Sequence, residues 1–192
     1  MRLLTIFGFI IFFSCSGQRS SKNKDFTELR DKLPTILTPL KLPRGLSHLS
    51  VVDLPDNEIL KGVKRKFEKR YLPFPVFGKL FDTEEYIAIL GEIPTSAGTP
   101  VMIVFDNQGN QIDSLVIYHD SSGYVADSTG ASQTYNYGQI LHDKKIISVD
   151  SLVEWDVDII QGVPFANEKS QRQSTVKRKY RILDNGRIEQ VE

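Results

Sequence analysis

A single cysteine is the first residue of this chain that could carry covalent chemistry. Cys15 holds the only thiol among 192 residues, and a thiolate is an intrinsically strong nucleophile. It follows Ser14 and the uncharged run LLTIFGFIIFF, which occupies residues 3–13 behind Arg2. A lone thiol forms no disulfide within the chain, and once it is modified none is left for metal binding or cysteine catalysis. The chemistry that we expect of Cys15 is therefore modification of its sulfur.

Three carboxylates stand at alternate positions in the last third of the chain. Glu154, Asp156 and Asp158 are separated by apolar residues, so on a strand they share one face and lie about 7 Å apart. Such a group could hold a metal ion or supply a general acid and base. A solvated strand face that lies beside a basic strand explains the pattern with fewer assumptions. We prefer that second interpretation.

Other signatures of catalysis are missing from the sequence. The histidines are His48, His119 and His142, and none belongs to an HExxH motif or to a helical pair. A metal site needs three or four ligands, which these residues do not supply. The sequence contains no nucleophile elbow G-x-S-x-G, no G-x-G-x-x-G and no phosphate-binding loop. We predict a protein that is not an enzyme and that uses no cofactor and no metal.

Three tyrosines offer a different kind of site. Tyr124, Tyr135 and Tyr137 occur near Asp127 and Asn136. Aromatic faces supply apolar contact and neighbouring polar groups fix orientation, so these residues could form a platform for a sugar ring or a peptide. The alternative is that the tyrosines only pack a sheet, because tyrosine is common in strands.

The segment before Cys15 resembles the lipobox of bacterial lipoproteins. A positive residue, an apolar run of 7–15 residues and a small residue form a secretory signal, and the run is too short to span a membrane stably. Phe12 stands where the family usually has leucine. The resemblance implies a signal peptide over residues 1–14 and a lipid on Cys15, whose acyl chains would hold the protein on a bilayer. A buried strand with an unreactive cysteine is the alternative.

Residues 16–24 read SGQRSSKNK and follow the anchor. They contain no large apolar residue, which predicts that residues 15–24 are a flexible tether with a reach of about 30 Å. Some lipoproteins sent to the outer cell surface have an acidic cluster after the cysteine, whereas here the first acid is Asp25. By that resemblance we expect the protein in the bacterial cell envelope, on the outer membrane and facing the periplasm.

The charge balance limits the partners of the mature chain. Without residues 1–14 it has 178 residues, with 23 Lys and Arg after the loss of Arg2, against 24 Asp and Glu. Nucleic-acid-binding domains usually carry a strong basic excess, so we expect no nucleic acid as partner. We expect residues 25–192 to form a single β-rich domain, whose length allows it to bury about 70% of its unfolded surface.

Helices are expected only in the first third of this domain. Asp25 is a candidate N-cap for a helix that ends before Pro34. A second helix is predicted over residues 56–71, because Leu60, Val63, Phe67 and Tyr71 recur at helical spacing. Its basic side could rest on anionic headgroups, although a solvated helix surface is the simpler interpretation.

Strands are expected from residue 76 onward. Residues 86–90 and 101–105 are short apolar runs, and the turn-forming DNQGNQ precedes a returning strand over residues 112–118. Residues 119–133 are small and polar, which predicts a long loop. Residues 153–159 alternate strictly and should pair with residues 176–182, where Lys177, Lys179 and Arg181 would face the three acids across the sheet. Asp184-Asn185-Gly186 predicts a tight turn before a last strand.

These patterns predict a mainly β (α+β) fold: an antiparallel meander that forms a sandwich or open barrel, with one or two short N-terminal helices. The segments EEYIAIL, VMIVFDNQGNQIDSLVI and KYRILDNGRIEQ make the body similar to small envelope lipoproteins of Gram-negative bacteria, a resemblance that implies no activity. We expect a membrane-anchored, non-enzymatic binding or envelope-interaction module with a protein or glycan partner. The alternatives are an inhibitor or immunity-type protein that blocks a partner enzyme, and a hydrolase.

Overall fold

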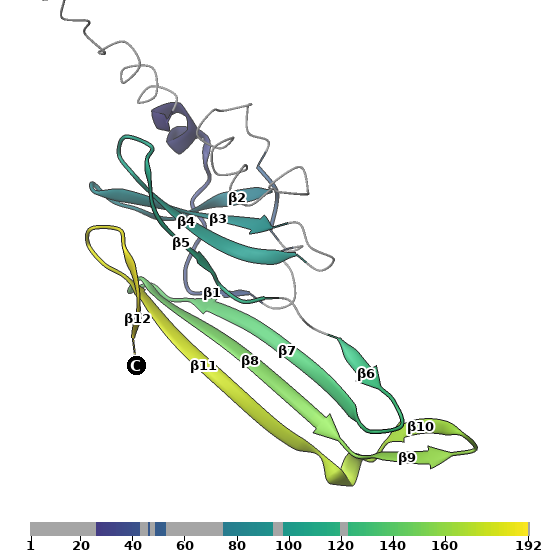
Figure 1. The fold of residues 1–192 in the computed structure, drawn as a ribbon. Coiled ribbons are helices and arrows are strands. Elements are labelled where there is room, and N and C mark those ends of the chain that lie inside the picture. Colours follow the sequence, from purple (N-terminus) through teal and green to yellow (C-terminus); the bar gives the residue numbers. More distant parts are fainter. Residues whose placement is uncertain are drawn as a thin grey trace, which may run out of the picture.

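The computed structural model describes residues 26–42, 46, 49–52, 75–93, 98–119 and 123–191, and strands dominate them (Figure 1). A four-stranded antiparallel sheet has the order β2 (Val76–Asp82), β3 (Tyr86–Ile93), β4 (Thr99–Asp106), β5 (Gln111–Val116). A six-stranded sheet has the order β1 (Leu40–Leu42), β7 (Ala131–Ile140), β8 (Lys145–Trp155), β11 (Arg172–Ile182), β12 (Ile188–Val191), and β6 (Tyr124–Ala126) also pairs with β7. A separate hairpin contains β9 (Val157–Ile160) and β10 (Val163–Ala166), and the 3₁₀ turn η1 (Glu168–Ser170) follows it. The predicted mainly β, antiparallel fold is confirmed.

The four-stranded sheet is buried on both faces. In β3 the side chains of Tyr86, Ala88 and Leu90 enter one apolar cluster, while those of Ile87 and Ile89 enter another. The same alternation continues on β4, where residues 101–105 are all buried. Successive side chains of a strand point to opposite faces, so an uninterrupted apolar run requires a cover on each side.

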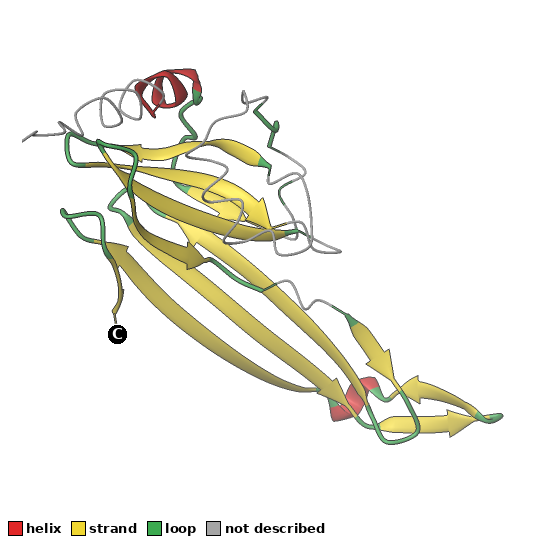
Figure 2. Cartoon of the chain, turned by 45° about the horizontal axis from the view of Figure 1, so that its top comes forward, coloured by secondary structure: helices red, strands yellow, loops and turns green. Residues whose placement is uncertain are grey.

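A short helix covers one face of this sheet (Figure 2). Residues 26–32 are helical, and Phe26, Leu29 and Leu33 lie on one side of the helix at spacings of three and four. All three are buried against the sheet, with the ring of Phe26 5.8 Å from that of Phe105. The first predicted helix is therefore confirmed for the described residues. Its predicted cap, the second helix over residues 56–71 and the lipobox lie outside them.

The six-stranded sheet covers the other face with only part of its length. Leu42, Ile140, Ile146 and Ile182 join the cluster beneath the four-stranded sheet. We call residues 40–42, 136–149 and 178–191 the base. The remaining residues, 123–135 and 150–177, extend beyond the four-stranded sheet as an arm that ends in β9 and β10 (Figure 1).

The turns follow the sequence predictions. Asp106 ends β4, and its Oδ1 accepts hydrogen bonds of 2.8 Å from the backbone N–H groups of Gln108 and Asn110, which builds the predicted hairpin turn. The tight turn at 184–186 is also present, since the N–H of Gly186 donates to the carbonyl of Leu183 at 2.9 Å.

Two sequence predictions in the arm are wrong. Residues 119–133 do not form one long loop, because β6 occupies residues 124–126 and β7 begins at residue 131. The strand predicted over residues 153–159 breaks at Asp156, whose N–H donates to Ser170 Oγ at 2.8 Å and whose carbonyl accepts from Asn167. These bonds replace the ladder hydrogen bonds that a continuous strand would form, and β9 pairs with β10 in a separate hairpin.

The charge pairing predicted between two strands is only half right. β8 and β11 are neighbours, as expected. Opposite residues in a ladder share a face, and Glu154 lies opposite Arg172 while Lys177 lies opposite Val149. Glu154 therefore lies on the other face from the bases, while Asp156 and Asp158 lie outside this ladder, so the prediction that the acids and the bases share one face of the two strands is wrong. The ion pairs formed instead are Arg172–Asp156 at 3.0 Å and Arg178–Asp150.

A small ionic cluster attaches the helix to the sheet. Arg30 binds the Asp82 carboxylate and also donates to the carbonyl of Thr83 at 2.8 Å, while Lys79 Nζ lies 2.8 Å from Asp82 Oδ2. Burial raises the pKa of Asp82, but the hydrogen bonds from Arg30 and Lys79 outweigh it and hold the pKa below its usual value.

We expect Asp82→Asn to lower the free energy of unfolding by about 1 kcal/mol near neutral pH, since the pairs are partly screened by water. Because the pKa of Asp82 is lower in the folded than in the unfolded state, its carboxylate stabilises the fold at pH values above the unfolded pKa of about 3.9. This contribution is lost as the pH falls through the folded pKa. Denaturant titrations should show a smaller difference in unfolding free energy between the wild type and Asp82→Asn at pH ~2 than at neutral pH.

The matched control for this measurement is Asp184→Asn. The Asp184 side chain is fully exposed and lies 3.4 Å from Lys144, so its replacement should change stability by less than about 0.5 kcal/mol. An equal loss for Asp82→Asn at both pH values would show that the carboxylate charge does not contribute.

Two turn glycines provide a second test of the packing. Gly186 and Gly162 have φ angles of 80° and 78°, so alanine costs about 1 kcal/mol at either position. A Cβ on Gly162 meets nothing within 4 Å, whereas one on Gly186 lies 2.6 Å from Ile112 Cδ1. Gly186→Ala should therefore cost about 1–3 kcal/mol more than Gly162→Ala in equilibrium unfolding. Equal losses of unfolding free energy in the two variants would show that the side chains around Gly186 rearrange at no cost.

Candidate binding face

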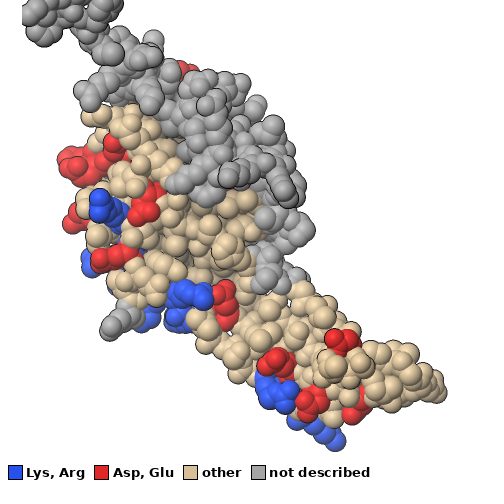
Figure 3. All heavy atoms as spheres, viewed as in Figure 1, with Lys and Arg blue, Asp and Glu red and all other residues tan. Residues whose placement is uncertain are grey.

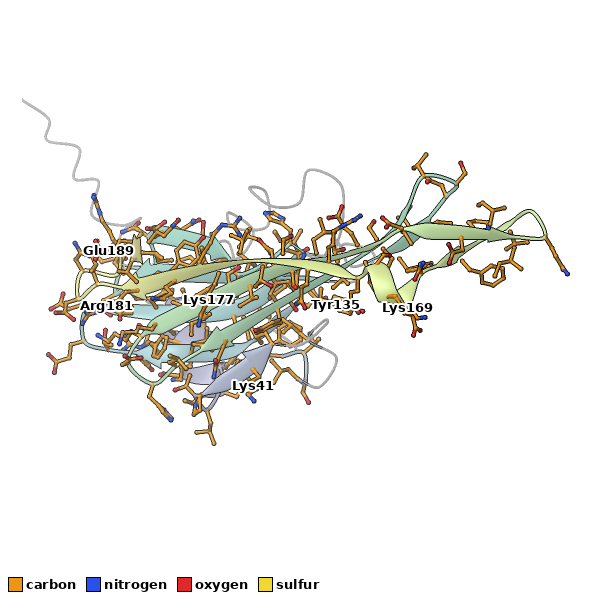
Figure 4. The ribbon with its side chains drawn as sticks, turned by 90° about the horizontal axis from the view of Figure 1, so that it is seen from below. Lys41, Tyr135, Lys169, Lys177, Arg181 and Glu189 are labelled. Carbon is orange, nitrogen blue, oxygen red and sulfur yellow. The ribbon has the colours of Figure 1, made fainter. Side chains whose placement is uncertain are left out.

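One side of the six-stranded sheet points away from the four-stranded sheet, and we call it the outer face. Ile140, Ile146 and Ile182 point into the core, so their neighbours along each strand point outward. Ladder register assigns the outer side chains as follows: on β7, Ala131, Gln133, Tyr135, Tyr137 and Gln139; on β8, Lys145, Ile147, Val149, Ser151, Val153 and Trp155; on β11, Gln173, Thr175, Lys177, Lys179 and Arg181. Figure 4, which views the molecule from below, shows Arg181, Lys177 and Tyr135 in succession along this sheet.

The three predicted tyrosines come together on the outer face. Tyr124 lies opposite Gln133 in the β6–β7 ladder, which places it on the side of Tyr135 and Tyr137. Their exposed fractions are 54%, 43% and 48% for Tyr124, Tyr135 and Tyr137. The ring of Trp155 lies 6.4 Å from that of Tyr124 and extends the aromatic surface. The register thus provides a platform, while ligand contact by these residues stays a prediction.

The strand between the tyrosines and the lysines forms a buried floor. Val149, Ser151 and Val153 of β8 are almost fully buried although they point outward, and residues of β7 and β11 flank them on both sides. Gln173 Nε2 donates to Ser151 Oγ at 2.9 Å, and Thr175 Oγ1 lies 3.2 Å from it. Side chains fixed in this way present a preorganised surface.

Of the two polar residues expected beside the tyrosines, Asn136 lies on the opposite face, whereas Asp127 follows the strand of Tyr124 and its ligand contact stays a prediction. Asp127 is in the β6–β7 turn, where its Oδ1 accepts from the N–H groups of Thr129 at 2.7 Å and Gly130 at 3.2 Å. The hydrogen bonds from Thr129 lower the pKa of Asp127. Asn136 points to the inner face, where it is buried and donates to the carbonyl of His119. The prediction that Asn136 accompanies the tyrosines is wrong, and Asp127 shapes the turn.

The sequence predicted the basic residues of β11 as partners of the acids and did not place them on the face of the tyrosines. Lys177 and Tyr137 lie opposite Val149 from its two sides, so they belong to one row across the sheet. Lys179 and Arg181 follow at alternate positions of β11. The alternation of bases in the sequence was a sufficient signal for a basic stripe, but only the pairing register shows that the stripe lies on the face of the tyrosines.

The histidines do not form a metal site among the described residues. His142 Nδ1 lies 3.0 Å from Thr38 Oγ1, whereas the carbonyl of His119 accepts a hydrogen bond from Asn136. His48 lies outside the described residues. Within the described ranges no group of three or more His, Cys, Asp or Glu could hold a metal ion.

A pocket of about 420 Å³ adjoins the base end of the outer face. Its lining consists of His142, Asp143, Lys144, Arg181, Ile182, Leu183 and Asp184. Most of its charges are paired: Lys144 lies 3.4 Å from Asp184, and Lys145 hydrogen-bonds Asp143 and lowers the pKa of that carboxyl. Arg181 belongs both to this pocket and to the outer face.

The tip of the arm exposes apolar side chains. Ile159, Ile160, Val163 and Phe165 have exposed fractions between 50% and 55%. Register places Ile160, Val163 and Phe165 on one face of the hairpin and Ile159 on the other. In Figure 3 this end of the molecule shows neither blue nor red atoms on the visible side. Exposed apolar groups of this kind are typical of contact surfaces.

Comparison of the chain with family models, with curated proteins and with solved structures finds no match. Among the described residues, no helix has the length and apolar character needed to cross a membrane. The class that the structure defines is a mainly β protein with a projecting sheet, one face of which combines tyrosines and cations.

Proposed function

We propose that this protein is a lipid-anchored, non-enzymatic binding module of the bacterial cell envelope, and that the outer face is its binding surface. The observation that carries the proposal is the placement of Tyr124, Tyr135 and Tyr137, all about half exposed, on one face. Tyrosine combines a large apolar ring with a polar tip. Such rings can stack on a sugar ring or a peptide while neighbouring polar groups fix the orientation.

The geometry of the sheet supports binding of an extended ligand. The outer side chains follow strands of up to 11 residues, which corresponds to a length of about 35 Å. The floor residues Val149 and Ser151 are fixed between their neighbours, so little side-chain freedom remains to be lost there on binding. The proposed ligand is a glycan, and a protein segment is the other partner class that the platform could hold.

The proposed anchor is a lipid on Cys15. It is supported by the apolar run over residues 3–13 and by Ser14, which together form a signal with a small residue before the cysteine. On this proposal the protein faces the periplasm from the outer membrane, and the binding face meets only partners near a membrane.

A second candidate function is inhibition of a partner enzyme, as in immunity-type proteins. The β9–β10 hairpin favours it, because Ile160 and Phe165 are half exposed at the end of the arm. A protein partner with an apolar cleft could cover both faces of this hairpin and pair with its strand edges.

The anchor has a direct test. Mass spectrometry of protein extracted from membranes should find a mature N-terminus at Cys15 that carries acyl mass. Cys15→Ser should leave an unmodified chain, because a serine hydroxyl is a much weaker nucleophile than a thiolate. An unmodified wild-type chain that begins at Met1 would contradict the anchor and leave the binding face untouched.

The binding face is tested by retention on an array of neutral and acidic glycans. Tyr135→Ala should weaken retention by about tenfold or more, because it removes a stacking face. The matched control is Phe165→Ala, which removes an aromatic ring of similar exposure from the hairpin and should leave retention unchanged.

The opposite pattern would support the alternative function. Co-purification of one stoichiometric protein partner that is lost in Phe165→Ala and kept in Tyr135→Ala would assign binding to the hairpin. Turnover of a hydrolase substrate that is lost on changing Asp156 or Glu154 would contradict both non-enzymatic functions.

A further inference from the structure

We propose that the ligand of the outer face is an acidic oligosaccharide that lies along the strands, with its anionic groups at the base and its uncharged rings over the arm. This inference rests on the proposed function and goes further, because it names the chemical class of the ligand and its direction on the face. It follows from the way in which charge and aromatic surface are distributed over the rows of the sheet.

The rows nearest the base are strongly basic. Three successive rows hold five cations: Lys41, Lys145, Lys177, Lys179 and Arg181. Successive rows on one face lie about 7 Å apart, so these cations cover about 14 Å along the strands. Among the described residues the acid in these rows is Glu189, opposite Arg181, and Lys145 also pairs with Asp143 in the adjoining turn. Even with Lys145 and Lys179 left out of the count, Lys41, Lys177 and Arg181 outnumber Glu189, and this positive surplus calls for an anionic group on the ligand.

The rows over the arm have a different composition. They contain aromatic rings, amides and hydroxyls: Tyr124, Gln133, Tyr135, Ser151, Trp155, Gln173 and Thr175. Amides and hydroxyls both donate and accept hydrogen bonds, which suits a ligand that is rich in hydroxyl groups. Tyrosine and tryptophan rings supply flat apolar contact for the faces of sugar rings. These rows therefore suit the uncharged part of a glycan.

The two halves meet at the row of Tyr137 and Lys177. Both flank Val149, whose side chain is only 4% exposed, and two strand spacings separate them by about 10 Å. A sugar ring above Val149 can contact the Tyr137 ring on one side and bring a carboxylate or phosphate to Lys177 on the other. In the described part of the chain, Lys177 forms no ion pair, so its charge is available to a ligand.

The same distribution disfavours two other polyanions. A single-stranded nucleic acid carries a phosphate on every nucleotide, so its binding groove needs cations along the whole length, whereas the rows beyond Tyr137 hold none. An anionic bilayer favours a protein surface whose cations are spread over the whole contact area. The part of the face that holds the hydrogen-bonded Gln173, Ser151 and Thr175 offers a bilayer no cation.

The experiment compares a galacturonic acid hexamer with its fully methyl-esterified form, which keeps the rings and removes the charge. Calorimetry on the full chain, extracted in detergent, should show the acidic hexamer binding at least about tenfold more tightly. Added salt should reduce this advantage, because exposed charges are screened. The double variant Lys177→Gln, Arg181→Gln should remove the advantage, so that the acidic hexamer and its ester bind with about equal affinity.

The control variant is Lys169→Gln, which removes one cation from η1, beyond Tyr135 along the arm and outside the three basic rows (Figure 4); it should alter neither affinity. Tyr135→Ala should weaken both ligands, with its fold verified by circular dichroism. Equal affinity for both hexamers, lost in Tyr135→Ala, would overturn the acidic ligand and keep the binding face. Binding of neither hexamer would overturn this inference, and glycan retention independent of Tyr135 would overturn the proposed function itself.

Discussion

Burial of both faces of the four-stranded sheet is the constraint on which the rest of the structure depends. β3 and β4 place large apolar side chains alternately on each side, and ten of these residues have almost no exposed surface: Tyr86, Ile87, Ala88, Ile89, Leu90, Val101, Met102, Ile103, Val104 and Phe105. Each apolar Å² removed from water contributes about 25 cal/mol. The helix at residues 26–32 supplies one cover and the base of the six-stranded sheet supplies the other. The base is therefore held by the core, and it fixes the direction in which the arm projects.

The arm obtains its order from its ladders and ion pairs, because the four-stranded sheet does not extend over it. β8 pairs with ten residues of β7 and ten of β11. On the inner face the charges neutralise each other, as in Arg178–Asp150, where the hydrogen bond that the guanidinium donates to the carboxylate raises the pKa of Arg178. On the outer face Tyr135, Tyr137 and Lys177 lie on both sides of a buried floor. The inner face thus stabilises the arm, while the outer face keeps groups that a ligand can use.

The sequence allowed the core to be predicted because its signals are local. The uninterrupted apolar runs at residues 86–90 and 101–105 and the turn at residues 184–186 all depend on neighbours in the chain. The arm depends on distant partners. Tyr124 is in a strand because it pairs with Gln133, although its surroundings are small and polar. Apolar and acidic residues do alternate through Asp156, but the backbone hydrogen bonds of Asp156 with Ser170 and Asn167 end the strand there.

The candidate site was predictable in its residue types and not in its arrangement. A shift of one residue in register moves every side chain of a strand to the other face, and no local pattern shows whether Lys177 lies opposite Val149 or Asp150. The register with Val149 separates two groups of charge that the sequence suggested were partners. Had Lys177 faced Asp150, the bases would have been neutralised within the sheet. Because they face Val149, a buried and uncharged neighbour, the basic stripe lies beside the tyrosines, and this separation gives the outer face its positive charge.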